Sequence, residues 1–156
     1  MRRYVNGFTM IELMVTLVVV AVLAALALPA FKGVFERSRA STEVNDLAKA
    51  LNYGRLEAIN RSQAVEVVPA DGQATGWANG ISIQQSSDGT VLRTIPAMSA
   101  GAQVMEENDI DSIEFNSFGG LSSPDKAVAF TYARGGQSRV VAVCLSGRIQ
   151  VGAGCN

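Results

Sequence analysis

Residues 6–15 read NGFTMIELMV, and they open an apolar segment that decides the fold of the N-terminal part of the chain. Residues 13–28 (LMVTLVVVAVLAALAL) carry no charge. Counted from Phe8, about 21 residues would form a helix of roughly 31 Å, which is enough to span a bilayer. Glu12 lies near the start of this run, although an acid at mid-membrane costs about 2.5–3.5 kcal/mol on insertion scales. Its position therefore calls for a specific role.

A secretory signal peptide is the alternative interpretation of this segment. Arg2 and Arg3 would form its basic region, and Ala25-Leu26-Ala27 is similar to a small-residue cleavage site. Two features disfavour it: a signal peptide gains nothing from Glu12, and the helical pattern continues beyond residue 27.

The chain beyond Pro29 has the apolar spacing of an amphipathic helix. The apolar positions are mostly three or four apart, and they are Val34, Val44, Leu47, Ala48, Leu51, Ala58 and Ile59. Pro29 and Gly33 should bend or loosen the helix locally. The pattern predicts one helix from Phe8 to about Asn60, whose first half suits lipid and whose second half suits a folded domain.

After Ser62 the sequence changes to short β-like runs separated by turn residues. Strands are predicted at residues 64–68, 80–84, 90–95, 112–115, 127–133, 139–145 and 148–151. Alternation at Ile81/Ile83 and Val128/Phe130/Tyr132 predicts an antiparallel sheet with one face packed on the second half of the helix. The fold class is therefore α+β with a protruding helix. Residues 118–126, FGGLSSPDK, are expected to form a loop.

Composition argues against catalysis. The 156 residues include no histidine, and 13 basic residues balance 14 acidic ones for a net charge of −1. Histidine-dependent triads and the commonest metal ligand are thereby excluded, so we expect no enzyme, no metal and no cofactor. Five carboxylates between residues 106 and 114 lack the ligand order of an EF-hand, and a solvated loop is the preferred interpretation over calcium binding.

The stretch GFTMIELMV resembles the class III signal of type IV pilins and type II secretion pseudopilins. The resemblance implies that a prepilin peptidase cuts between Gly7 and Phe8 and N-methylates Phe8. Glu12 would then meet the new α-amino group of Phe8 on an adjacent subunit, because an unpaired carboxylate in an apolar filament core is costly. Pro29 lies where such helices commonly carry proline, and a kink is expected there. The implied domains are a leader (1–7), a transmembrane and filament-core helix (8–29), an amphipathic helix (30–61) and a periplasmic β-rich domain (62–156).

Most of the chain resembles the GspH/FimT group of minor pilins and pseudopilins, through LAKALNYGRLEAINRSQAVEV, GWANGISI and VCLSGRIQVGAGC. This resemblance implies a type IV pilin-like fold and a minor pilin that helps to initiate or cap a type IV pilus. A GspH-like pseudopilin of type II secretion is the alternative; the C-terminal CLSGRIQVGAGC is most similar to FimU-like members and favours the pilus. Expected partners are other pilins or pseudopilins, the prepilin peptidase and the bacterial inner membrane, with a single span and the globular domain in the periplasm.

Cys144 and Cys155 are the two cysteines of the chain, and an even count in an exported protein suggests one disulfide. They bracket a predicted hairpin with a two-residue turn at Ser146-Gly147. Two free thiols are the alternative.

Binding of nucleic acid is a third functional alternative. FimT-like members resemble one another in a C-terminal Gly-Arg-x-Arg that contacts DNA, whereas this chain has Gly147-Arg148-Ile149-Gln150 and lacks the second arginine. Arg134, Arg139 and Arg148 would together suffice for weak, salt-sensitive phosphate contacts. Ordinary strand-face arginines on a slightly acidic domain are the preferred interpretation.

Overall fold

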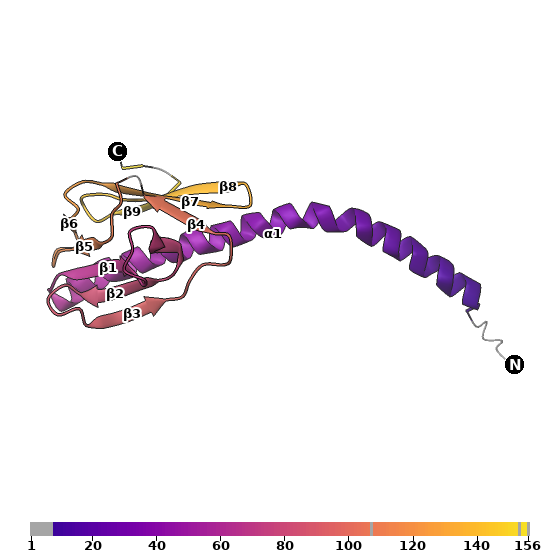
Figure 1. Ribbon diagram of the computed structural model, residues 1–156, viewed down its shortest axis with the longest axis horizontal. Helices are drawn as coiled ribbons and strands as arrows, with labels where there is room; N and C mark the ends of the chain where they lie inside the picture. Colours follow the sequence, from indigo (N-terminus) through magenta and orange to yellow (C-terminus); the bar gives the residue numbers. More distant parts are fainter. Residues whose placement is uncertain (1–7, 107, 153, 156) are drawn as a thin grey trace, which may run out of the picture. The chain divides into compact units, whose positions relative to one another are not determined.

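The computed structural model describes residues 8–106, 108–152 and 154–155, with the backbone alone for residues 28–30. The chain divides into two compact units, Met1–Glu36 and Arg37–Asn156. A single helix, α1 (Met10–Arg61, 52 residues), begins in the first unit and ends in the second, as the sequence predicts (Figure 1). Its backbone is helical through Pro29, and a bend at that residue stays a prediction.

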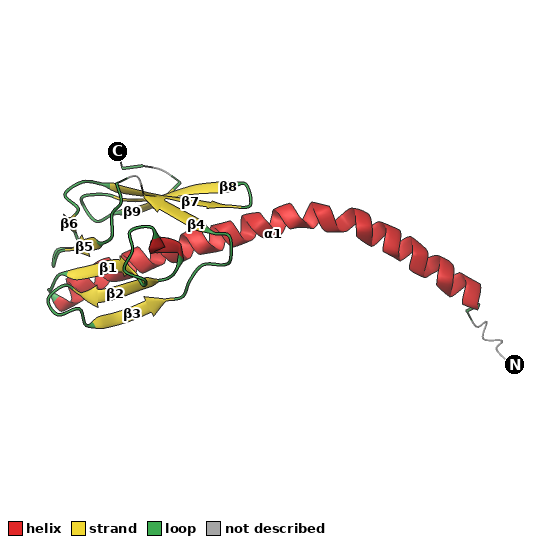
Figure 2. Cartoon of the chain, in the orientation of Figure 1, coloured by secondary structure: helices red, strands yellow, loops and turns green. Residues whose placement is uncertain are grey.

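Nine strands follow α1 within the described residues, with one short 3-10 helix, η1, among them (Figure 2). The elements are β1 (Val65–Pro69), η1 (Gly76–Ala78), β2 (Ile81–Gln85), β3 (Val91–Ile95), β4 (Gln103–Glu106), β5 (Ile113–Phe115), β6 (Leu121–Ser123), β7 (Val128–Arg134), β8 (Gln137–Val143) and β9 (Ile149–Val151). All seven predicted strands are present. The expectation of a loop over residues 118–126 is wrong at β6, and β4 was not predicted.

The strands form two antiparallel sheets where the alternation predicted one. The five-stranded sheet has the order β3-β2-β1-β5-β6, and the four-stranded sheet has the order β4-β7-β8-β9. In the first sheet β1 lies between β2 and β5, so strands distant in sequence pair in register, as Val65 does with Phe115. A connection of this kind leaves no local signal in the sequence, because alternation reports a strand's faces and not its neighbours.

One apolar core joins the second half of α1 to both sheets. Its helix positions are spaced three, four or seven residues apart, which places them on one face: Ala40, Val44, Leu47, Leu51 and Ala58. Buried residues alternate along the strands, as in Val65/Val67 of β1 and Phe130/Tyr132 of β7. The predicted apolar positions Val34 and Ile59 are exposed instead, because they lie off this face.

The helix approaches the five-stranded sheet closely at Gly54. A Cβ at this residue would lie 2.5 Å from the Cγ2 atom of Val67 and 3.7 Å from side-chain atoms of Ile83 and Phe115. Glycine is unfavourable within a helix by about 1 kcal/mol relative to alanine. Here it permits a helix-to-sheet distance that any side chain would prevent.

Trp77 of η1 anchors the core where the two sheets meet the helix. Its side chain is fully buried, its Nε1 donates to the carbonyl oxygen of Ile110 at 2.9 Å, and its ring lies 4.7 Å from that of Phe130. Its burial and its satisfied N–H give Trp77 a structural role as a core anchor.

Candidate functional site

Thr9 and Glu12 form a reciprocal capping interaction at the start of α1. The backbone N–H of Glu12 donates to Oγ1 of Thr9 at 3.3 Å, and the N–H of Thr9 donates to Oε2 of Glu12 at 3.4 Å. This is the capping box of a Thr-x-x-Glu sequence, which satisfies two backbone donors that a helix N-terminus leaves unpaired. The signal is present in residues 9–12, and the sequence analysis missed it. In the single subunit Glu12 therefore already has a structural role.

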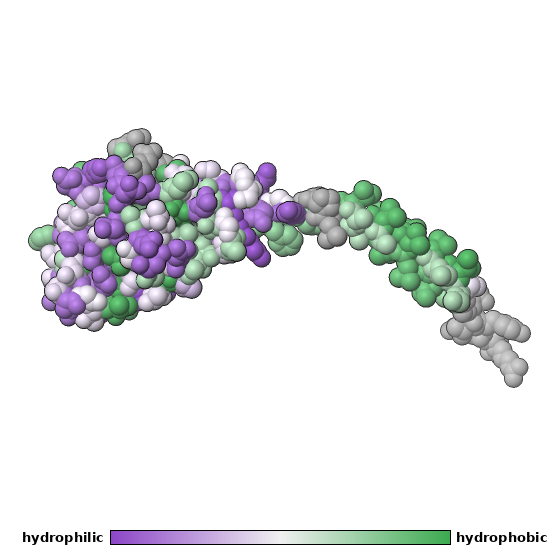
Figure 3. Space-filling model, in the orientation of Figure 1, coloured by the Kyte–Doolittle hydropathy of each residue, from purple (hydrophilic) through white to green (hydrophobic). Residues whose placement is uncertain are grey.

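The apolar part of α1 is exposed along its whole length in the single chain. Met10–Ala27, 18 residues, is long and apolar enough to cross a membrane, and none of it is buried. Figure 3 shows hydrophobic residues on the visible side of this segment, in contrast to the mixed surface over the strands. An apolar surface of this extent needs a cover of lipid or of other helices.

The predicted processing residues lie immediately before the helix. Phe8 is exposed and non-helical, and Gly7 lies outside the described residues. Cleavage between Gly7 and Phe8, methylation of Phe8 and the contact of Glu12 with a neighbour's amino group stay predictions.

Glu43 of α1 is the centre of a polar network that sequence reasoning missed. Its Oε2 accepts a hydrogen bond from Tyr132 at 2.6 Å, and its Oε1 accepts from the backbone N–H of Ser99 at 3.1 Å and from Nη1 of Arg134 at 3.3 Å. The hydroxyl of Ser99 bonds both Glu43 and Arg134. The network ties α1 to β7 and to the segment before β4. The residues are up to 91 positions apart, so no local pattern could reveal it.

The protonation of Glu43 reflects this network. Burial by itself would raise the pKa of the carboxyl group, because it disfavours the charged form. Hydrogen bonds from Ser99 and Tyr132 and the charge of Arg134 outweigh burial, so the pKa lies below its usual value of 4.5. Glu43 is therefore ionised at neutral pH and holds the guanidinium of Arg134.

The three arginines predicted as a DNA contact lie in different environments. Arg134 forms the ion pair with Glu43, and its side chain is only 10% exposed. Arg139 of β8 and Arg148, which precedes β9, are exposed. When the Gln150 amide is oriented so that its nitrogen donates to the carbonyl oxygen of Gly154, its oxygen accepts hydrogen bonds from Nε and Nη2 of Arg148 at 3.0 and 2.9 Å. Arg134 is committed to the core network, and DNA contact by Arg139 and Arg148 stays a prediction.

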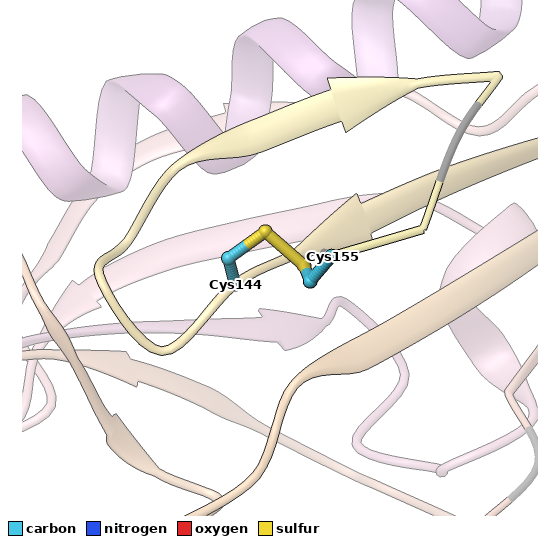
Figure 4. The surroundings of a disulfide bond; sticks show 2 residues. All are labelled: Cys144 and Cys155. Atoms are coloured by element: carbon cyan, nitrogen blue, oxygen red, sulfur yellow. A yellow bond between two sulfur atoms is a disulfide. The ribbon is translucent and has the colours of Figure 1, made fainter.

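A disulfide joins Cys144 to Cys155, as predicted, with the two Cα atoms 5.4 Å apart (Figure 4). It links the end of β8 to the residues that follow β9, the edge strand of its sheet. The predicted two-residue turn is wrong: the N–H of Cys144 donates to the carbonyl oxygen of Arg148, and that of Gly147 donates to the carbonyl oxygen of Cys144. Three residues, 145–147, therefore form the connection, and Gly147 supplies the positive φ of 74° that such a loop requires.

The acidic stretch after β4 organises its own turn. Oε2 of Glu106 accepts from the backbone N–H groups of Asn108 at 2.6 Å and Ile110 at 3.1 Å. Among the described residues, no group of three or more carboxylates or cysteines is arranged to hold a metal ion.

A long apolar helix that continues into a β-rich unit, closed by a C-terminal disulfide, defines a type IV pilin-like protein. The model of the family described as Type II transport protein GspH matches residues 43–148, and that of the Prokaryotic N-terminal methylation motif matches residues 2–28. The chain belongs to the GspH family. The family and fold are those of structural pilins rather than enzymes, and such proteins assemble with other pilins.

Solved structures and a curated relative agree with this assignment. Two crystal forms of the Pseudomonas aeruginosa type IV minor pilin FimU share the fold, each at 24% identity. Their TM-scores are 0.64 and 0.59; the matches cover 74% and 71% of this chain and 89% and 90% of those chains. The fimbrial protein EcpC of Eikenella corrodens is 35% identical over 79 residues, 50% of this chain. The chain spans about half the length of that relative, 48%.

Proposed function

We propose that this protein is a minor pilin of a type IV pilus that helps to initiate or cap pilus assembly. The observation that carries the proposal is the exposed apolar surface of Met10–Ala27, which lies within the matched methylation motif and is followed along the chain by a compact β-rich unit. Lipid would cover this surface before assembly, and the helices of neighbouring subunits would cover it in the filament. The FimU fold and the fimbrial relative support a pilus over other pilin-like machines.

In this proposal each part of the chain has one task. Residues 1–7 are removed, residues 8–29 span the inner membrane once and later join the filament core, and residues 30–61 connect them to a globular domain at 62–156 in the periplasm. Glu12 selects a processed neighbour, because its carboxylate is stabilised in an apolar core by the free amino group of Phe8.

The test of Glu12 separates its charge from its capping role. Glu12→Ala removes both, whereas Glu12→Gln keeps a side chain that still completes the capping box. We expect both variants to enter the membrane and both to be lost from sheared filaments by at least tenfold relative to the parent. Incorporation of Glu12→Gln at the parental level would assign Glu12 to capping alone and refute the charge pairing.

A pseudopilin of type II secretion is the second candidate, favoured by the description of the matching family itself. The two functions differ in the phenotype of a deletion. A pilus protein is required for surface piliation and twitching motility, and a pseudopilin for export of enzymes. We expect loss of piliation with unchanged enzyme export; the reverse result would assign the chain to secretion.

A further inference from the structure

The part of α1 that follows the apolar span, residues 31–39, exposes apolar and basic side chains together; it is called here the interfacial segment. Phe31, Val34 and Phe35 are 57%, 62% and 64% exposed. Because they are three and four residues apart, they lie on one side of the helix. The segment has a net charge of +2, since it contains one acid and three basic residues. The basic residues, all exposed, are Lys32, Arg37 and Arg39.

Helix geometry places the interfacial segment at the surface of a bilayer. The uncharged residues from Leu13 to Phe31 number 19. As a helix they are roughly 28 Å long, close to the ~30 Å thickness of the hydrocarbon core. The helix continues without a break beyond Phe31. Val34 and Phe35 therefore lie about 4–6 Å beyond the core, in a headgroup layer that is about 5–8 Å deep on each side of the bilayer.

The headgroup layer suits both kinds of side chain in this segment. The apolar side chains of interfacial helices bury at the boundary between acyl chains and headgroups. Arg37 and Arg39 lie about 9 and 12 Å beyond Phe31 along the helix axis. Their long aliphatic parts let the guanidinium groups reach back toward the phosphates. Anionic lipid attracts basic segments of this kind, and the attraction is strongest next to the end of a span.

A helix of a neighbouring protein is the alternative cover for Phe31, Val34 and Phe35. Such a partner would need its own acidic groups opposite the basic residues, because a cation buried without a partner is costly. The lipid needs no further assumption about its position. The bilayer that covers Met10–Ala27 continues along the same helix onto the next turns, and its phosphates carry the complementary charge.

The orientation of the span gives a second argument. In the proposed function the interfacial segment lies on the periplasmic side, whereas basic residues next to a span normally favour the cytoplasmic side. Three basic residues at this end of the span therefore call for a function of their own. Binding to anionic headgroups supplies one.

We propose that residues 31–39 bind anionic phospholipid headgroups at the C-terminal end of the span and thereby fix the depth of α1 in the membrane. The apolar face would enter the boundary of the acyl chains, and the three cations would contact phosphate groups. The inference rests on the proposed function for the membrane span of residues 8–29 and for its orientation.

The test uses the full-length protein in vesicles, with an environment-sensitive fluorophore attached to Ser38→Cys. Ser38 is exposed, and the native cysteines are paired in the disulfide. A lipid that is spin-labelled near its headgroup quenches the fluorophore where the two meet. We expect at least about twofold stronger quenching in phosphatidylcholine vesicles that contain about one third phosphatidylglycerol than in phosphatidylcholine alone. The excess should disappear at about 1 M salt, because salt screens the attraction.

Substitutions separate the charges from the apolar face. The triple variant Lys32→Gln, Arg37→Gln and Arg39→Gln should abolish the difference between the two lipids. The pair Phe31→Ser and Phe35→Ser, which removes no charge, should weaken quenching in both lipids. The matched control removes three exposed positive charges outside the segment and should leave the difference unchanged. It consists of Lys49→Gln, Arg61→Gln and Arg139→Gln.

Equal quenching in the two lipids, a signal insensitive to salt, or a triple variant that behaves like the parent would overturn the inference. Shielding of Ser38 that appears only at high protein-to-lipid ratios would also overturn it, since it would assign the surface to protein contacts. Absence of lipid contact together with loss of the Glu12 variants from filaments would leave the proposed function intact. Lipid contact in a chain whose deletion leaves piliation unchanged would refute the function and keep the contact.

Discussion

At the scale of single residues, the contribution of Glu43 to the stability of the fold should depend on pH. Its carboxylate has a pKa below 4.5 in the folded chain, so it stabilises the fold above that pH and ceases to do so as the pH falls through the folded pKa. The side chains of Glu43 and Arg134 are 14% and 10% exposed, so solvent screens their interaction less than it screens a surface pair.

We predict that Glu43→Gln lowers the free energy of unfolding by about 1–3 kcal/mol at pH 7, because charge-assisted hydrogen bonds are lost. The difference from the parent should shrink as the pH falls well below 4.5, since protonation removes the same interactions from the parent. Urea denaturation of detergent-solubilised protein at neutral and acidic pH measures this. Tyr132→Phe, which removes one donor and no charge, should show a smaller effect; a pH-independent difference for Glu43→Gln would contradict the prediction.

Among secondary-structure elements, the two glycines within α1 should respond to alanine in opposite ways. At Gly54 a Cβ meets Val67, a buried β-branched residue with little rotamer freedom, whereas at Gly33 it meets no atom within 4 Å. We predict that Gly33→Ala stabilises the helix by about 0.5–1 kcal/mol. Gly54→Ala should destabilise the fold by about 1–3 kcal/mol through overpacking.

Thermal unfolding followed by circular dichroism compares the two variants directly. The gain in helix propensity from glycine to alanine is the same at both positions. The difference in stability between Gly33→Ala and Gly54→Ala therefore measures the effect of the close packing of α1 on the sheet. Equal effects would show that the helix can move away from β1 at no cost.

The disulfide should stabilise β9 in particular. Closing a loop with a sequence separation of 11 residues is worth about 3 kcal/mol in the chain-entropy model. We predict that the pair Cys144→Ser and Cys155→Ser loses about this amount, and that hydrogen exchange quickens at Ile149 and Val151 more than in β7. Reduction of the parent should reproduce the effect, and uniform acceleration across the sheet would contradict a local role.

The elements that the sequence predicted are those with a regular period. Alternation marked β2 and β7, and three-to-four spacing marked the buried face of α1 at Val44, Leu47 and Leu51. The strand β6 was missed because its three residues, Leu121–Ser123, are short and mostly exposed among turn residues. The division into two sheets depends on which strands pair, and Glu43 meets Arg134 only through the tertiary fold; neither has a local signature.

At the scale of the whole molecule, the apolar core residues among those that the structure describes lie from Ala40 onward. The unit Arg37–Asn156 therefore loses no core side chain when the preceding residues are removed. We predict that residues 37–156 expressed alone fold cooperatively, with the disulfide formed and a free energy of unfolding within about 1 kcal/mol of that of the globular unit in the full chain. Chemical denaturation followed by tryptophan fluorescence at Trp77 reports this, and a non-cooperative transition would show that the apolar segment is needed for folding.

The cap at Thr9 and Glu12 also bears on proteolytic processing. Because the helix begins at Met10, Phe8 stays outside the hydrogen-bonded turns. Proteases bind backbone in an extended form, and a helix that began earlier would have to unwind before its bonds could be cut. By setting the first turn after Phe8, Thr9 would keep the predicted scissile bond available to a peptidase while the segment behind it is already helical in the membrane.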